Sequence, residues 1–121
     1  PICVQCRPEL AVVGLSEAEA RAAAIPVKVG KCVMGGNART LVLNPGRSFM
    51  KLVAHAESGE LLGAQLMCPN ASDMISQLGE AIANHMTPRQ LLRAMRPHPT
   101  FEEALGDALS DLEHKLNKSQ Q

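Results

Sequence analysis

The sequence has almost no aromatic side chains and no net charge. Phe49 and Phe101 are its only aromatic residues, so it offers little surface on which a nucleic-acid base or a sugar could stack. Twelve Lys and Arg residues balance twelve Asp and Glu residues, and no basic run creates a local positive field. These absences argue against nucleic-acid binding.

Long apolar runs are also missing. Charges or prolines interrupt every apolar run well before the roughly 20 residues that a membrane-spanning helix needs, and no charged-then-apolar leader begins the chain. We therefore expect a soluble, cytoplasmic protein without membrane contact. The chain starts at Pro1 in a segment with the pattern of a strand, as a piece excised from a longer chain would.

The four cysteines do not have the spacing of a small secreted disulfide scaffold. Cys3, Cys6, Cys32 and Cys68 lie among apolar neighbours, which predicts reduced and mostly buried thiols. The Cys3-x-x-Cys6 spacing also occurs in metal knuckles and redox pairs. A structural zinc site needs a second pair of ligands, however, and residues three apart in a strand point to opposite faces. No metal site is predicted.

The N-terminal part is predicted to hold two short strands and a helix. The strands lie within residues 2–15, on either side of a proline-held turn at residues 7–9. Ser16 and Glu19 have the spacing of a capping box, which predicts a helix that runs to Ala24 before the next proline.

Three further strands are expected in the middle of the chain. Val27, Val29 and Val33 alternate with lysines and a glycine, which predicts a strand with one wet face, and the glycines that follow mark a break. Residues 49–56 and 61–68 have the clearest hairpin pattern, with a glycine in the connecting turn.

Three helices are predicted in the C-terminal half. Residues 70–86 repeat apolar side chains at helical spacing, which predicts one buried face. Thr87 followed by Pro88 is typical of a helix start, so a second helix should run to about Ala94. A third begins at Thr100. The side chains expected to face inward from the last two helices are Leu91, Leu92, Met95, Phe101, Ala104, Leu105, Ala108, Leu109, Leu112 and Leu116.

The order of these elements indicates the fold class. Strands come first and helices afterwards, and the strands are joined by hairpins rather than crossovers. This order predicts an α+β fold, in which an antiparallel sheet is covered by helices in a two-layer sandwich. A single domain is expected over residues 1–116, followed by a polar tail at residues 117–121.

The connector between the last two helices carries the best candidate for chemistry. Pro97 and Pro99 flank His98, so the imidazole is oriented at little entropic cost. Glu103 is close enough to accept a hydrogen bond from this ring, and a carboxylate partner makes a histidine a positioned general base. Thr100 and Glu103 also have the spacing of a capping box, in which Glu103 would bond only to the backbone. Spacing alone leaves both roles open.

Residues 98–104 resemble the His-Pro-Thr-x-x-Glu-Ala sequence near the C terminus of dihydrolipoamide dehydrogenases, in the family of pyridine-nucleotide:disulphide oxidoreductases. Arg96, Pro97 and Cys68 depart from the pattern of that family. The resemblance nevertheless covers almost the whole chain. Further segments that match in order and at similar spacing are residues 8–11, 13–17, 27–30, 37–39, 50–52, 62–64 and 69–71.

The resemblance implies a C-terminal interface domain that forms a two-fold homodimer. It implies that His98 and Pro99 contact the flavin of the partner subunit, and that the bond before Pro99 is cis. His98 would take a thiol proton from dihydrolipoamide, carried by a protein or a small dithiol, while Glu103 orients the imidazole. FAD and NAD are the cofactors implied for the full-length enzyme, and some members of the family reduce other disulphides or electrophiles.

Neither cofactor is expected to bind this chain alone. The sequence has no G-x-G-x-x-G pattern that opens a helix after a strand, and no C-x₄-C pair that could shuttle electrons. We therefore expect the chain to be inactive by itself. A free-standing interaction module with the same fold and no catalytic task is the alternative.

Overall fold

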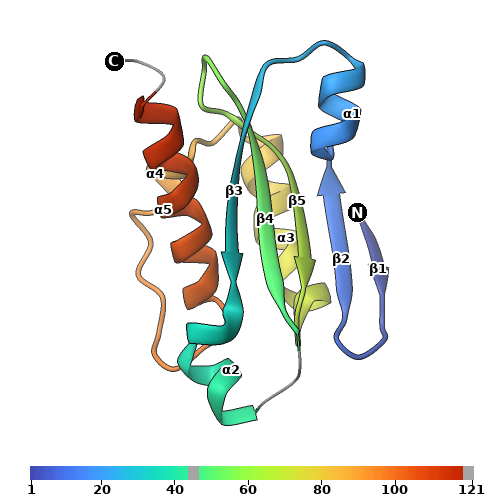
Figure 1. Cartoon of the computed structure of the whole chain (residues 1–121), viewed down its shortest axis with the longest axis vertical. Coiled ribbons are helices and arrows are strands. Elements are labelled where there is room, and N and C mark those ends of the chain that lie inside the picture. Colours follow the sequence, from blue (N-terminus) through green and yellow to red (C-terminus); the bar gives the residue numbers. More distant parts are fainter. Residues whose placement is uncertain (44–46, 119–121) are drawn as a thin grey trace.

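The structure is a computed structural model that describes residues 1–43 and 47–118. One antiparallel sheet of five strands forms the centre of this part of the chain (Figure 1). The strands are β1 (Ile2–Val4), β2 (Leu10–Gly14), β3 (Val27–Val33), β4 (Phe49–His55) and β5 (Leu61–Met67). The helices are α1 (Glu17–Ala22), η1 (Met34–Gly36), α2 (Ala38–Leu43), α3 (Ala71–Ala83), α4 (Pro88–Leu91) and α5 (Glu103–Lys118). The order across the sheet is β1-β2-β5-β4-β3.

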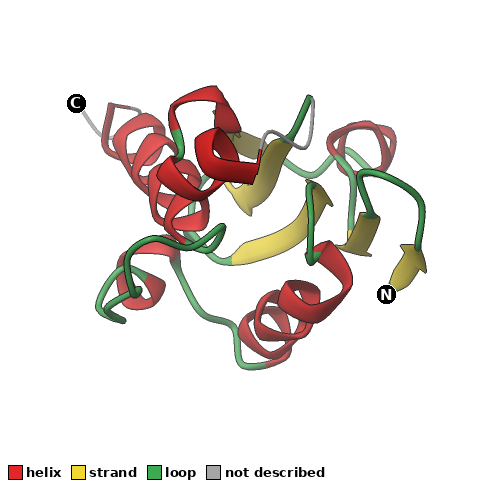
Figure 2. Cartoon of the chain, turned by 90° about the horizontal axis from the view of Figure 1, so that it is seen from below, coloured by secondary structure: helices red, strands yellow, loops and turns green. Residues whose placement is uncertain are grey.

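Helices α3 and α5 cover one face of this sheet. α3 lies behind β4 and β5 in Figure 1 and contacts β2 and β5, while α5 contacts β3 and β4. α1 lies at the opposite face, where Glu17 forms a salt bridge with Lys51 of β4. Figure 2 looks along the strands and shows helices flanking the sheet. The predicted α+β fold, an antiparallel sheet covered by helices, is confirmed.

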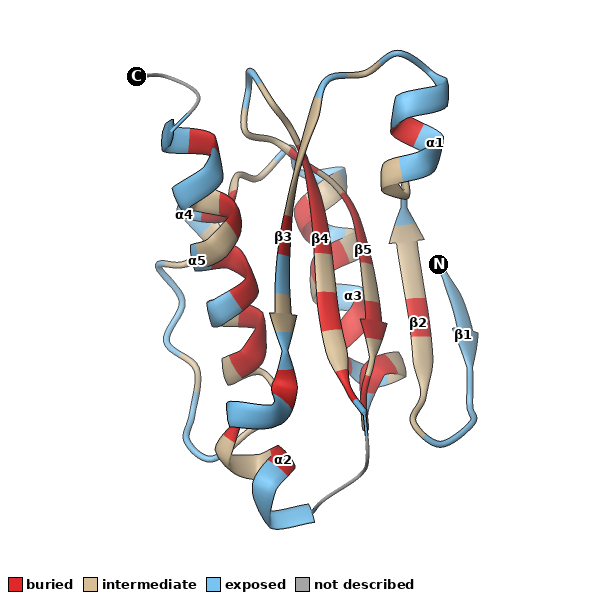
Figure 3. Ribbon diagram, in the orientation of Figure 1, coloured by how far each residue is buried: buried red, intermediate tan, exposed pale blue. Residues whose placement is uncertain are grey.

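The core lies between the sheet and the apolar faces of α3 and α5. Figure 3 shows buried positions along the central strands and on both of these helices. The helical spacing that predicted the buried faces is confirmed, because side chains three and four residues apart share one face. The buried side chains that α3 and α5 contribute are Ala71, Met74, Ile75, Leu78, Ala81, Ala104, Leu105, Ala108, Leu109, Leu112 and Leu116, and the buried Phe101 lies just ahead of α5.

The covered face of β3 is not the valine face. Gly30 is buried, whereas Val33 is 66% exposed at the end of the strand. A Cβ built at Gly30 would lie 2.5 Å from Cβ of Leu112 in α5. Only a residue without a side chain allows α5 to approach β3 so closely, so the glycine faces the helix and the valines face away.

Helix α4 is shorter than predicted. It ends at Leu91 instead of running to about Ala94, and Met95 is 97% exposed rather than facing inward. The inward position of Met95 assumed that the helix continued one turn beyond Leu91. Because the helix ends before Met95, the spacing of four residues no longer places Met95 on the same face as Leu91. The prediction for Met95 is wrong.

Helix α5 starts later and ends later than the sequence predicted. It begins at Glu103 rather than Thr100 and continues to Lys118, past the predicted boundary after residue 116. Residues 119–121 of the expected polar tail lie outside the described residues. No helix among the described residues, α5 included, combines the length and apolar character required to cross a membrane.

The cysteines differ in exposure, contrary to the expectation of mostly buried thiols. Cys3 lies in the edge strand β1 and Cys6 in the turn that follows it, and both are exposed, whereas Cys68 is fully buried. Burial, with a smaller contribution from Glu9, raises the pKa of the Cys68 thiol to about 12. Burial also raises the pKa of the half-buried Cys32. Cys3 and Cys6 are therefore accessible to reagents, whereas the raised pKa values of Cys32 and Cys68 make those two thiols less reactive.

Candidate functional site

The connector between α4 and α5 holds the candidate catalytic pair. Residues 92–102 form neither helix nor strand, and Pro97, His98 and Pro99 are exposed. The peptide bond between His98 and Pro99 is cis, as the resemblance implied. Phe101 is only 5% exposed and anchors the end of the connector in the core. The connector is thus fixed near α5 and open to solvent around His98.

The imidazole of His98 is joined to the carboxylate of Glu103. Its Nδ1 lies 2.9 Å from Oε1 and 3.0 Å from Oε2 of Glu103. A carboxylate at this position accepts the Nδ1–H and leaves the lone pair of the ring on Nε2. The His98 side chain is 69% exposed, so it is not packed into the core. A ring held in this way can accept a proton at Nε2 from a group outside the chain.

Glu103 has both contacts that its spacing left open. Its Oε1 accepts a hydrogen bond from the backbone N–H of Thr100 at 2.9 Å, which is half of a capping box. The other half would need Thr100 as the N-cap, but α5 begins only at Glu103, and the Thr100 hydroxyl donates to the Pro97 carbonyl at 2.8 Å. Hydrogen bonds from His98 and from the Thr100 N–H lower the pKa of the Glu103 carboxyl, so this group is ionised opposite the imidazole near neutral pH.

Arg96 ties the start of the connector to the end of α4. Its Nη2 donates to the carbonyl of Leu91 at 3.3 Å and its Nη1 donates to the carbonyl of Ala94 at 3.1 Å. Both carbonyls lie at or just past the end of α4, so the guanidinium holds the connector against that helix end. The sequence singled out Arg96 only as a departure from a family pattern. A basic residue just past a helix end is the one signal that points to this contact.

A second histidine–glutamate pair lies at the C-terminal end of α3. His85 contacts Glu60 through Nδ1, and the His85 side chain is 77% exposed. This pair joins the residue before β5 to the turn after α3, and the sequence predicted no chemistry for it. The same types of side chain therefore form a pair outside the connector, which provides a natural control for variants of His98.

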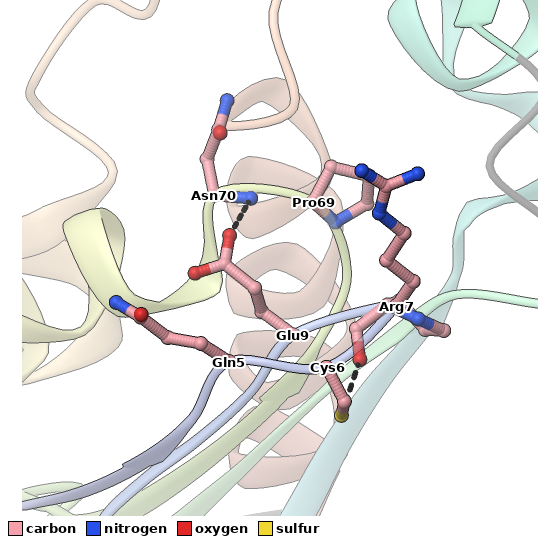
Figure 4. A pocket seen from close by; sticks show the side chains of 7 residues that line it. Gln5, Cys6, Arg7, Glu9, Pro69 and Asn70 are labelled. Carbon is pink, nitrogen blue, oxygen red and sulfur yellow. Dashed lines mark hydrogen bonds between the residues drawn. The ribbon is translucent and has the colours of Figure 1, made fainter.

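A pocket of about 530 Å³ lies beside the turn between β1 and β2 (Figure 4). The carboxylate of Glu9 accepts hydrogen bonds there from the N–H of Asn70, at 2.8 Å, and from the hydroxyl of Ser72. The thiol of Cys6 donates to the Pro8 carbonyl at 3.0 Å. The bonds of Glu9 fasten the turn to the start of α3, whereas the bond of Cys6 lies within the turn. Within residues 1–43 and 47–118, no group of three or more His, Cys, Asp and Glu side chains could hold a metal ion.

Comparisons with known proteins agree with this architecture. The model of the family described as pyridine nucleotide-disulphide oxidoreductase, dimerisation domain, matches residues 1–109. A dihydrolipoyl dehydrogenase of Bacillus subtilis is 38% identical over 108 residues, which are 89% of this chain and 23% of that protein. A dihydrolipoyl dehydrogenase of Geobacillus stearothermophilus is 41% identical over the same shares of the two chains.

A solved structure has the same fold. The HOCl-induced flavoprotein disulfide reductase of Escherichia coli superposes with a TM-score of 0.84 and 26% identity, over 90% of this chain and 25% of that one. The chain thus spans about a quarter of the length of the relatives that it matches. On the match over residues 1–109 and the identity to dihydrolipoyl dehydrogenases, the chain belongs to the dimerisation-domain family of the pyridine nucleotide-disulphide oxidoreductases.

Proposed function

We propose that this chain dimerises a flavin-dependent dihydrolipoamide dehydrogenase and supplies His98 and Glu103 as an acid/base pair to the active site of the partner subunit. The observation that carries the proposal is the contact of Nδ1 of His98 with both carboxylate oxygens of Glu103, at 2.9 and 3.0 Å, on a largely exposed ring. His85 and Glu60 form a similar exposed pair, so what distinguishes His98 is its place on the connector, in the part of the chain that matches the dimerisation-domain family.

The chemistry assigned to His98 is the removal of a proton from a thiol of dihydrolipoamide. Its Nε2 accepts the proton, and the resulting thiolate attacks a sulfur of the redox disulphide. A new S–S bond then forms as the old one breaks, and the released sulfur leaves as a thiolate. The second thiol of the substrate completes the exchange, so the substrate becomes a disulphide while the protein disulphide becomes a dithiol. Glu103 holds the ring through Nδ1 and stabilises the imidazolium that forms.

FAD and NAD are the cofactors proposed for the full-length protein, where they would carry the two electrons away from the dithiol. The residues of this chain that would contact the flavin of a partner subunit are His98 and Pro99. Their exposure suits this role, because a group held by another subunit can reach them without any rearrangement of the core.

Homodimer formation is proposed from the same family membership, which is described as a dimerisation domain. The chain has apolar side chains in α2 that a second copy could cover, with Leu41 at 66% and Val42 at 70% exposure. Sedimentation at tens of micromolar should give a dimer. A clean monomer at that concentration would count against this part of the proposal.

The catalytic part is tested with His98→Ala in the full-length protein. We expect turnover of dihydrolipoamide to fall by at least about tenfold, since a positioned general base contributes about 10² to 10⁴ in rate. Flavin content should not change. His85→Asn is the matched control: it removes the other exposed imidazole paired with a glutamate, and Asn tolerates the positive φ of 54° at that position. Equal turnover in the wild type and in His98→Ala would remove His98 from the mechanism.

A further inference from the structure

The side chain of Asn37 joins α2 to the connector that carries His98. It is 7% exposed, and its Nδ2 donates to the carbonyl of Thr100 at 3.0 Å, between residues 63 positions apart in the sequence. Its Oδ1 accepts from the backbone N–H of Thr40 at 3.0 Å and from the Thr40 hydroxyl at 3.1 Å. A buried amide engaged on both sides fixes the relative position of the groups that it joins.

The end of this link at Asn37 is attached to the sheet. The N–H of Asn37 donates to the carbonyl of Met34 at 3.0 Å, and the N–H of Met34 donates to the carbonyl of Ser48 at 3.0 Å. Met34 is fully buried in the core. These bonds lead from Asn37 to the end of the β3–β4 pair, so the amide is attached to the sheet and, through Met34, to the core.

The other end of the link is the residue that also orients the catalytic pair. Thr100 receives the hydrogen bond from Asn37 at its carbonyl, and its N–H donates to Oε1 of Glu103. The same Oε1 lies 2.9 Å from Nδ1 of His98. Thr100 is thus held from both sides of its backbone, and its position sets where Glu103 and His98 meet.

We propose that Asn37 is a positioning residue for His98, a role that rests on the proposed function. The imidazole is 69% exposed, so packing cannot define its position, and residues 92–102 have no helix or strand to hold it. Hydrogen bonds must therefore supply the precision that proton transfer requires. The bond from Asn37 to Thr100 ties the connector to the sheet. It is separate from the contacts that His98 makes with its neighbours in the sequence.

A purely structural role for Asn37 would be to cap α2. Its Oδ1 already performs that task through Thr40, and the cap does not use the bond from Nδ2 to Thr100. Asn37→Ser keeps a good N-cap but is too short and has no amide to reach Thr100. Thr40→Val is the matched control, because it removes the hydroxyl that contacts Asn37 and leaves the bond to Thr100 in place.

The test uses the full-length flavoprotein and two activities. One is turnover of dihydrolipoamide. The other is reduction of ferricyanide by NADH, which needs no base for a thiol. We expect Asn37→Ser to lower kcat for dihydrolipoamide by at least about fivefold, with KM within about twofold, because small misplacements of a reacting group cost rate rather than binding. Reduction of ferricyanide and flavin content should stay at the wild-type level, and Thr40→Val should match the wild type in every assay.

Three results would overturn the role of Asn37. They are full kcat in Asn37→Ser, an equal loss in Thr40→Val, and a parallel loss of both activities, which is the sign of a general structural defect. Asn37→Asp is a second variant in case Asn37→Ser folds poorly. It keeps an acceptor for Thr40 but places an oxygen against the Thr100 carbonyl, so it should lose kcat in the same selective way. Measuring His98→Ala in parallel distinguishes the two proposals. If only His98→Ala loses turnover, the proposed function is supported and the role of Asn37 is refuted. Full turnover in His98→Ala would refute both.

Discussion

Replacement of Gly30 by alanine should destabilise the chain. A Cβ at this position would lie 2.5 Å from Cβ of Leu112 and 2.6 Å from the carbonyl oxygen of Ala108, both in α5. Carbon atoms pack at about 3.5–4.0 Å, so α5 would have to move away from β3 by roughly 1 Å. Overpacking in a core costs about 1–3 kcal/mol. The upper end applies here, because neither a backbone oxygen nor a Cβ can rotate out of the way.

A smaller effect opposes this cost. Glycine inside a strand or helix is less favourable than alanine by roughly 0.5–1 kcal/mol, so the new Cβ recovers that amount. The net expectation for Gly30→Ala is a loss of about 2 kcal/mol in the free energy of unfolding. Urea unfolding followed by circular dichroism measures it, since the midpoint shifts with stability at constant slope.

Gly79→Ala provides the matched control for this experiment. Gly79 lies inside α3, and the nearest atom to a Cβ there is Cγ2 of Val13 at 3.8 Å, an ordinary contact. This variant should be more stable than the wild type by about 0.5–1 kcal/mol, because alanine favours the helix. If Gly30→Ala were as stable as Gly79→Ala, the close approach of α5 to β3 would be wrong, and with it the account of why the valines of β3 face away from the helix.

Further predictions concern Glu103 and the cysteines. Glu103→Gln keeps an oxygen for the Thr100 N–H but removes the charge, so turnover of dihydrolipoamide should fall at least about threefold, with a smaller drop in melting temperature than Glu103→Ala gives. Equal turnover in the wild type and both variants would refute the pairing with His98. Because the pKa of Glu103 is lowered in the folded chain, the stabilisation by its bonds is fully present above the ordinary Glu pKa and is lost as the pH falls through the lowered value. The NMR signal of the Glu103 carboxyl carbon should therefore show protonation of that group only in acid below the usual range of a Glu carboxyl, and protonation within or above that range would contradict this. A thiol reagent should label Cys3 and Cys6 in the folded chain and Cys68 only after unfolding, as mass spectrometry can measure. The pKa of the Cys68 thiol is about 12 instead of 9.0, which leaves about 10³-fold less thiolate. Rapid labelling of Cys68 in the folded chain would disprove its burial.

The elements that the sequence predicted correctly are those defined by local patterns. The capping box at Ser16 and Glu19 is present at the start of α1. The hairpin of β4 and β5 and the buried faces of α3 and α5 follow from turn residues and from apolar spacing along single segments. In each case the residues that determine the element are close neighbours in the sequence, so the element can be predicted from a single sequence.

The elements that the sequence missed depend on contacts between distant segments. The face of β3 is decided by α5, about 80 residues further along the chain, which packs on Gly30. Helix α2 has no apolar face to reveal it, because Leu41, Val42 and Leu43 are all exposed. The contact between Asn37 and Thr100 left only one local trace, the Asn-x-x-Thr spacing of a helix N-cap.

The sequence spacing leaves the role of Glu103 open between capping and pairing, but the two roles are compatible. A carboxylate has two oxygens and several lone pairs, so it can accept from the Thr100 N–H and from His98 at the same time. The bond to Thr100 fixes the carboxylate at the first residue of α5, and the packing of α5 on Gly30 fixes that helix against the sheet. The imidazole therefore takes its position from the core through the helix start, and a cap at this place is a means of orienting the histidine rather than an alternative to it.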